Sequence, residues 1–112
     1  MPIDKKMVYF VGGWHMNPVG YYKVGISANV KIRIHQIQTH SPFLILPIVV
    51  VKHKNAAWLE QAVLDEFKSN RIRGEWFYVL CESKKKVNET TGIFCDSVKK
   101  FMLENGGKEV EL

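Results

Sequence analysis

The sequence predicts an α+β fold: a small antiparallel three-stranded sheet flanked by helices, followed by a C-terminal helix. Short runs rich in Val, Ile, Tyr and Phe lie between turn signals, as strands usually do. Between these runs, apolar residues recur at helical spacing. The order is strand, strand, helix, strand, helix. No linker, repeat or low-complexity tract divides the 112 residues, so we expect a single domain over residues 1–112.

The first two strands are expected over residues 7–13 and 21–26, where β-branched and aromatic residues predominate. Glycines and the Asn17-Pro18 pair mark a connection longer than a two-residue turn. We interpret this connection as a simple turn. The alternative is that it projects toward a ligand, with His15 and Asn17 in contact with DNA.

The first helix is expected from about Ala28 to Gln38, with Ser27 as its N-cap. Residues at i, i+4 and i+7 form one apolar stripe that we expect to be buried, made of Val30, Ile34 and Ile37. Arg33 lies immediately beside this stripe. An arginine in such a place is usually only a solvated surface residue, so its function has to be argued from other residues.

A third strand is expected over about residues 43–52, with Pro47 at an edge position or a bulge because proline cannot donate to a ladder. Asn55 is expected to cap a second helix over about residues 56–69. Glu60 borders the apolar face of that helix and is expected to point partly inward, where a carboxylate needs a cation or metal as partner. Glu66 borders the same face, so periodicity alone does not choose between the two.

After the second helix, the arginines 71 and 73 are expected to flank a turn that ends at Gly74. A further strand is expected over residues 75–80, with Trp76 packed in the core rather than stacked on a base. The C-terminal helix is expected over about residues 89–104, within an extension of about 88–105. Residues 108–112 are expected to be frayed.

Composition and charge narrow the classes of partner. Hydrophobic residues make up 46% of the chain, so a folded domain is expected. Residues 1–80 contain ten Lys or Arg and five Asp or Glu, whereas residues 81–112 contain six of each. The whole net charge of +5 therefore lies on the first part. This distribution favours a polyanionic partner, although +5 is also an ordinary charge for solubility.

Other site classes find little support in the sequence. Cys81 and Cys95 lack the paired spacing of a zinc site, and the four histidines form no ligand pattern, so reduced thiols are expected. No apolar run approaches the roughly 18 residues of a membrane helix, and the start of the chain lacks the order of a signal peptide. We therefore expect an intracellular protein, cytoplasmic or in the nucleoid or nucleus, without a membrane partner.

The ordered set of motifs resembles the GIY-YIG endonuclease superfamily over about residues 7–80. Val8-Tyr9-Phe10 falls where GIY falls, and Lys23-Val24-Gly25 falls where YIG falls. Arg33 has the spacing of that family's helix arginine, and Leu59-Glu60 looks like its glutamate helix. The run ending in Gly74-Glu75-Trp76-Phe77 is similar to a phage- and fungus-associated, DNA-binding branch. This chain departs from the superfamily in having Lys23 where the second tyrosine is usual.

The resemblance implies a Mg²⁺-dependent (or Mn²⁺-dependent) DNA endonuclease that hydrolyses phosphodiester bonds, with Tyr9, Lys23, Arg33 and Glu60 as catalytic residues. Tyr9 would accept or relay the proton, although a tyrosine ordinarily has a pKa of about 10 and needs a nearby cation. Lys23 is either that cation or, if burial favours its neutral form, the base itself. Arg33 would hold the scissile phosphate, and Glu60 would bind the metal ion.

Beyond this set, several side chains are candidates for DNA contact or for a supporting role. The candidates for DNA contact are Lys31, Arg33, His35, Arg71 and Arg73, and the secondary candidates are Tyr22 and Glu75. A chain this short has little room for a separate specificity domain. We therefore expect either low intrinsic specificity or a homodimer that supplies it.

Two alternatives remain open at this point. One is a non-catalytic DNA-binding module on the same fold, in which Lys23 marks lost chemistry. The other is a domain that docks onto another protein through its terminal helix. The joint presence of Tyr9, Arg33 and Glu60 favours the enzyme.

Overall fold

The computed structural model of the chain describes residues 6–14, 19–42, 44–80 and 87–112. Within these residues, six strands form one sheet in the order β4-β5-β2-β1-β3-β6, and every neighbouring pair is antiparallel. The elements are β1 (Met7–Trp14), β2 (Val19–Ser27), α1 (Val30–Thr39), β3 (Ile45–Lys52), α2 (Ala56–Glu66), a 3₁₀ turn (Lys68–Asn70), β4 (Arg71–Arg73), β5 (Trp76–Leu80), α3 (Val87–Glu104) and β6 (Lys108–Glu109). The predicted α+β class with an antiparallel sheet is confirmed.

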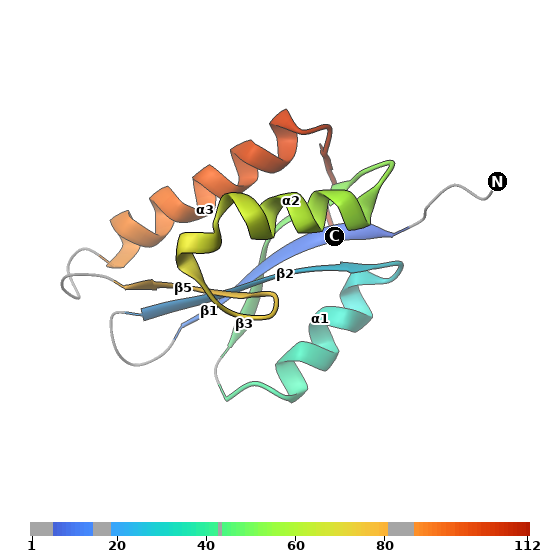
Figure 1. Cartoon of the computed structure of the whole chain (residues 1–112). Helices are drawn as coiled ribbons and strands as arrows, with labels where there is room; N and C mark the ends of the chain where they lie inside the picture. The colour runs from blue at the N-terminus through green and yellow to red at the C-terminus, as the bar shows by residue number, and fades with distance from the viewer. Residues whose placement is uncertain (1–5, 15–18, 43, 81–86) are drawn as a thin grey trace.

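The sheet separates two layers of helices. Figure 1 shows α2 and α3 on one face of the sheet and α1 alone on the other. Because successive side chains of a strand point to opposite faces, β1 and β2 contribute to both layers. Each layer therefore has its own hydrophobic core.

The larger core lies under α2 and α3, where β1 and β2 contribute Val8, Phe10, Tyr22 and Val24. The smaller core lies under α1 and includes Tyr9, Val11, Val30, Ile37 and Val50, with Ile34 and Trp76 partly buried against it. The predicted apolar stripe of the first helix is confirmed. Tyr9 thus belongs to the face that α1 covers.

The sheet is larger than the predicted three strands. Arg71–Arg73 forms β4 rather than only the flank of a turn, and Lys108–Glu109 forms β6 rather than a frayed end. Both strands are short and lie at the sheet edges, where pairing depends on a neighbour distant in sequence. The strand propensity of a two- or three-residue segment is too weak to predict such pairing.

The bulge predicted near Pro47 and the helix N-cap predicted at Asn55 are confirmed, whereas the N-cap predicted at Ser27 is wrong. The pairing of β1 with β3 shifts between Phe10 and Val11, which confirms the bulge predicted near Pro47. Asn55 caps α2 as predicted, with its side chain accepting from the Trp58 N–H. The N-cap of α1, however, is Asn29: Ser27 ends β2, and its hydroxyl accepts from the Asn29 N–H at 3.0 Å. The second helix ends at Glu66, three residues earlier than predicted.

Some of the predicted features fall outside the described residues, namely His15, Asn17, Phe43 and Cys81. Cys95 is a free thiol on α3. None of the described helices is long and apolar enough to cross a membrane.

Candidate functional site

Tyr9 and Arg33 meet on the face of the sheet that α1 covers. Tyr9 is 1% exposed, and its hydroxyl accepts a hydrogen bond from Arg33 Nε at 3.4 Å. Arg33 itself is exposed, and its Nη1 donates to Gln36 Oε1, one turn further along α1, at 3.3 Å. The whole Tyr9 side chain, hydroxyl included, is therefore buried, and the Arg33 guanidinium connects it to the exposed surface.

Backbone geometry sets the place of Tyr9. Tyr9 of β1 pairs with Gly25 of β2, and the Tyr9 phenol occupies the space that a side chain at position 25 would take. Lys23, two residues earlier on β2, points to the same face. The hairpin register thus places Tyr9 and Lys23 diagonally across adjacent strands, where side chains of this length are close neighbours.

Lys23 is held by the turn between β4 and β5. Its Nζ lies 2.7 Å from Glu75 Oε2 and 5.5 Å from the centroid of the Trp76 ring. The residue is only 8% exposed. The hairpin that carries Glu75 and Trp76 turns at Gly74, whose φ of 57° favours glycine. Both contacts favour a charged ammonium, by ion pairing and by cation–π attraction.

Glu60 reaches this cluster around the edge of the sheet. It lies on α2, which covers the face opposite α1, but β5 pairs with β2 only as far as Trp76 and Lys23. Beyond that point, no strand of the described chain covers this edge of β2. Burial raises the pKa of the Glu60 carboxyl, and the charge of Glu75 and a hydrogen bond with it raise this pKa further, while Lys23 partly offsets the rise.

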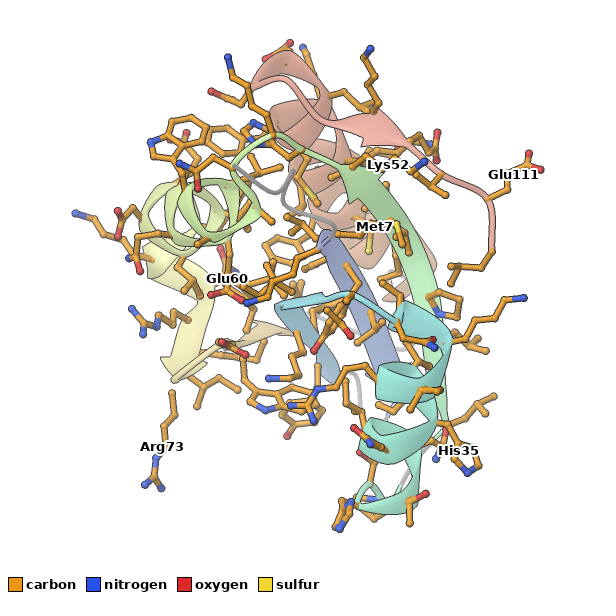
Figure 2. All side chains as sticks on the ribbon, turned by 90° about the vertical axis from the view of Figure 1, so that its right-hand side faces the viewer. Met7, His35, Lys52, Glu60, Arg73 and Glu111 are labelled. Carbon is orange, nitrogen blue, oxygen red and sulfur yellow. The ribbon has the colours of Figure 1, made fainter. Side chains whose placement is uncertain are left out.

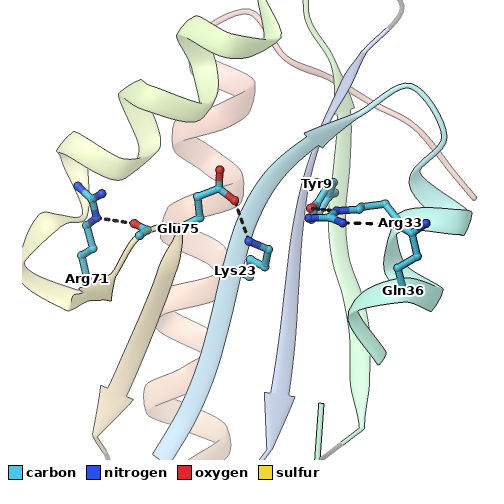
Figure 3. A network of polar contacts seen from close by, with 7 residues as sticks. Tyr9, Lys23, Arg33, Gln36, Arg71 and Glu75 are labelled. Carbon is cyan, nitrogen blue, oxygen red and sulfur yellow. Dashed lines mark hydrogen bonds and ion pairs between the residues drawn. The ribbon is translucent and has the colours of Figure 1, made fainter. Parts of the chain in front are cut away.

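The polar contacts form a row across the sheet (Figure 3). From β4 to α1 the row contains Arg71, whose Nε donates to the Gly74 carbonyl, then Glu75, Lys23, Tyr9 and Arg33. The structure therefore brings Tyr9, Lys23, Arg33 and Glu75 to one face, with Glu60 joined through its interactions with Glu75 and Lys23. Within the described residues, no hydrogen bond links Glu60 directly to Tyr9 or Arg33.

Tyr22, a secondary candidate in the sequence, does not join this cluster. Its side chain points to the opposite face, is 2% exposed, and stacks on Phe10 with ring centroids 5.6 Å apart. Phe94 of α3 packs against the same ring at 5.3 Å. Tyr22 is therefore a core residue, which corrects the sequence-based candidate.

Three of the predicted DNA contacts lie away from the row. Lys31 and His35 are exposed on α1, but each is two residues, about 200°, from Arg33 around the helix. Figure 2 shows His35 pointing outward on the far side of α1, and Arg73 pointing outward from the β4 end of the sheet. Only Arg33 and Arg71 of the proposed contacts thus belong to the row itself.

The acidic groups available for a metal ion are few. In the part of the chain that the structure describes, no group of three or more His, Cys, Asp or Glu is arranged to hold a metal ion. Glu60 and Glu75 are nevertheless two interacting carboxylates, and a divalent cation would relieve their repulsion. Mg²⁺ commonly binds one or two carboxylates and completes its shell with water and substrate phosphate. The donor set therefore fits Mg²⁺ in the presence of a phosphodiester.

Sequence reasoning missed two members of the site. Gln36 binds Arg33 from an i+3 position, a spacing that is visible in the sequence but common to every helix. Trp76 was expected in the core and is indeed partly buried there, yet it also holds the Lys23 ammonium. That second contact joins residues 53 positions apart, and no local signal announces it.

Comparison with known proteins gave one match. A family model described as the T5orf172 domain matches residues 6–95, which run from the start of β1 into α3. The matched range contains every residue of the polar row together with Glu60. Neither the curated proteins nor the solved structures yielded a match.

Proposed function

The chain belongs to the T5orf172 domain family, and from this premise we propose that it is a metal-dependent DNA endonuclease of GIY-YIG type. The family is associated with DNA-binding endonucleases. The observation that carries the proposal is the hydrogen bond between Arg33 and Tyr9, next to Lys23 on the same face. It combines an exposed, phosphate-binding guanidinium with a buried proton-accepting or relaying hydroxyl.

In this proposal, Arg33 binds the scissile phosphate through the N–H groups that face solvent. A guanidinium matches the geometry of phosphate oxygens, and it stays charged throughout the reaction. Water attacks phosphorus, and the P–O bond to one deoxyribose breaks. The proton of the water passes to the Tyr9 oxygen, which either starts ionised or gives up its own proton in exchange, and the released deoxyribose oxygen takes up a proton from solvent. The Arg33–Tyr9 contact keeps the phosphate and the proton acceptor at neighbouring positions.

The surroundings of Lys23 favour its role as a cation over its role as a base. Its ammonium faces the Glu75 carboxylate and the Trp76 ring, and both stabilise positive charge. A base at this position would have to lose a proton against these contacts. Lys23 in our proposal therefore stays charged. It offsets the negative charge of Tyr9 in its ionised form and the negative charge that builds up on the phosphorus oxygens.

Glu60 would hold the divalent cation, with Glu75 as the neighbouring carboxylate. When bound, Mg²⁺ stabilises negative charge on the phosphate and on the leaving oxygen. The raised pKa of Glu60 means that its carboxyl keeps a proton to a higher pH than an ordinary glutamate does, so a proton and a cation compete for this carboxylate. Metal binding should consequently strengthen as the pH rises through the pKa of Glu60.

A second candidate is a DNA-binding module without cleavage, and one observation favours it. The Lys23 ammonium is already paired with Glu75, which leaves less of its charge for a reacting phosphate. A protein-docking role for the terminal helix has less support, because α3 buries Phe94, Val98 and Met102 against the sheet of its own domain.

Nicking of supercoiled plasmid separates these candidates. Purified protein is incubated with plasmid alone and with Mg²⁺ or Mn²⁺, and Glu60→Gln and Arg33→Ala are assayed beside it. We expect metal-dependent nicking that Glu60→Gln abolishes without weakening DNA binding, and that Arg33→Ala reduces together with phosphate affinity. Binding without nicking under any metal condition would favour the second candidate, and Lys23→Tyr then asks whether the residue usual in the superfamily restores cleavage.

A further inference from the structure

A pocket lies beside the Tyr9–Arg33 pair, at the side of α1 that faces the sheet. Its volume is about 430 Å³, within the range of roughly 300–1,000 Å³ that small-molecule pockets have. The residues that line it are Arg33, Gln36, Ile37, His40, Ser41 and Trp76. Arg33 also belongs to the polar row through its hydrogen bond to Tyr9, and Trp76 contacts the Lys23 ammonium of that row.

The lining suits a planar ligand with a polar edge. Ile37 is buried and Trp76 is partly buried, so the pocket has apolar and aromatic surface. Arg33 is its single cationic residue, whereas a site for a free polyanion would need several. Aromatic rings and guanidinium planes are the surfaces on which nucleobases stack in single-strand binding proteins.

The polar groups at the rim offer both a donor and an acceptor. The Gln36 oxygen accepts from Arg33, and this orients the carboxamide so that its –NH₂ group is the part left for a ligand. His40 Nδ1 lies 2.9 Å from the Gln36 backbone carbonyl, an oxygen that only accepts, so Nδ1 carries the proton. The Nε2 atom of the neutral imidazole is then an acceptor. A donor next to an acceptor is the pattern that complements the edge of a base.

We propose that this pocket binds one unpaired nucleobase of the DNA strand whose phosphate is bound by Arg33. The inference rests on the proposed function, because it assumes that Arg33 binds a DNA phosphate. A base inside a duplex is stacked and paired, so it reaches such a pocket only from a single strand or after leaving the stack. The preferred substrate is therefore DNA with an unpaired base next to the bound phosphate.

Binding, rather than cleavage, tests this inference. Two fluorescein-labelled single-stranded oligodeoxynucleotides are compared by anisotropy in EDTA at one salt concentration: an oligothymidylate and an abasic strand with the same number of phosphates. Because stacking of a base on an aromatic side chain is strong, we expect the oligothymidylate to bind about ten-fold more tightly. Equal affinities for the two strands would overturn the pocket and leave the proposed phosphate contact standing.

Variants of the pocket residues test whether this pocket causes the preference for the strand that carries bases. Trp76→Leu should bring the affinity ratio close to one, and Trp76→Phe should retain much of it. Gln36→Ala changes an exposed helix residue and should lower the ratio several-fold while the fold persists. Gln61→Ala, the matched exposed glutamine on α2, should leave the ratio unchanged. A wild-type preference that survives both Trp76→Leu and Gln36→Ala would overturn the assignment, and failure to bind either strand at low salt would overturn both this inference and the proposed function.

Discussion

The Tyr9 phenol lies over the backbone of Gly25, in the space where any other residue at position 25 would carry its Cβ atom. The glycine is buried and belongs to an ordinary antiparallel pair, so no turn requires it. What requires it is the close approach of the tyrosine ring. Gly25 thereby determines where the hydroxyl meets Arg33.

Gly25→Ala should therefore displace Tyr9. We expect a loss of about 1–3 kcal/mol in the free energy of unfolding, since the added methyl group overpacks the core under α1. Nicking should fall more than DNA affinity, because the phosphate contact of Arg33 persists. Gly92→Ala is the matched control: nothing lies within 4 Å of a Cβ at this helical position, and helix propensity should raise stability by about 0.5–1 kcal/mol. Urea unfolding measures the stability effect, and plasmid nicking measures the effect on activity. An undiminished nicking rate in Gly25→Ala would argue against a role of Tyr9 in cleavage.

Tyr9→Phe removes one oxygen and keeps the ring. The hydroxyl accepts a long hydrogen bond of 3.4 Å, so we expect a stability change of about 1 kcal/mol or less. If Tyr9 accepts or relays the proton, the nicking rate should fall by about 10²–10⁴-fold at unchanged DNA affinity. Single-turnover nicking and anisotropy provide the two numbers. A wild-type nicking rate in Tyr9→Phe would show that a group other than Tyr9 accepts the proton.

Substitutions of Lys23 and Glu75 should have non-additive effects on the free energy of unfolding. Glu75→Gln leaves a nearly buried ammonium with a weaker partner, and Lys23→Met removes the charge at similar volume. A double-mutant cycle should give a coupling of about 1–2 kcal/mol, because the pair is charged and hydrogen-bonded but the Glu75 side chain is 38% exposed. Lys99 and Glu109, an exposed pair at 3.1 Å, should couple by about 0.5 kcal/mol or less. Equal coupling energies in the two pairs would contradict the claim that burial of Lys23 strengthens its ion pair with Glu75.

The raised pKa of Glu60 implies a pH dependence of stability. Its folded-state pKa lies above the ordinary value of 4.5, so the neutral form contributes stability that is complete below pH 4.5 and is lost as the pH rises through the folded-state pKa. Glu60→Gln resembles the neutral form and does not titrate. The difference in Tm between Glu60→Gln and wild type should therefore become more positive as the pH rises from 4 to 7. Glu66→Gln, an exposed change on the same helix, serves as control in the same thermal scans.

DNA affinity should depend steeply on salt. For duplex DNA, the slope of log affinity against log salt is about −0.9 for each phosphate contact. Arg33→Ala and Arg73→Ala should each reduce the slope by about one contact if both bind phosphate, but only Arg33→Ala should also reduce nicking. A wild-type slope near zero would count against both nucleic-acid functions.

Much of the fold followed from local sequence signals. Runs of β-branched and aromatic residues between turn signals predicted the first two strands, and helical periodicity predicted the buried face of α1 and the presence of α3. Asn55 announced the start of α2 through its capping chemistry. The motif spacing also selected Tyr9, Lys23, Arg33 and Glu60 before any arrangement was visible.

Tertiary structure decided which of these residues meet. Tyr22 and Lys23 are adjacent in sequence, yet the pleat of β2 sends one into the core and the other to the site. Glu75 lies 52 residues after Lys23, and Glu60 lies on the opposite layer, so their approach depends on where β5 stops pairing with β2. The edge strands β4 and β6 likewise form only because distant segments offer them a partner. Sequence periodicity predicts which face of a single helix or strand is buried. The pairing of charged residues on different elements depends on strand register and packing, which are defined only when the whole sheet has formed.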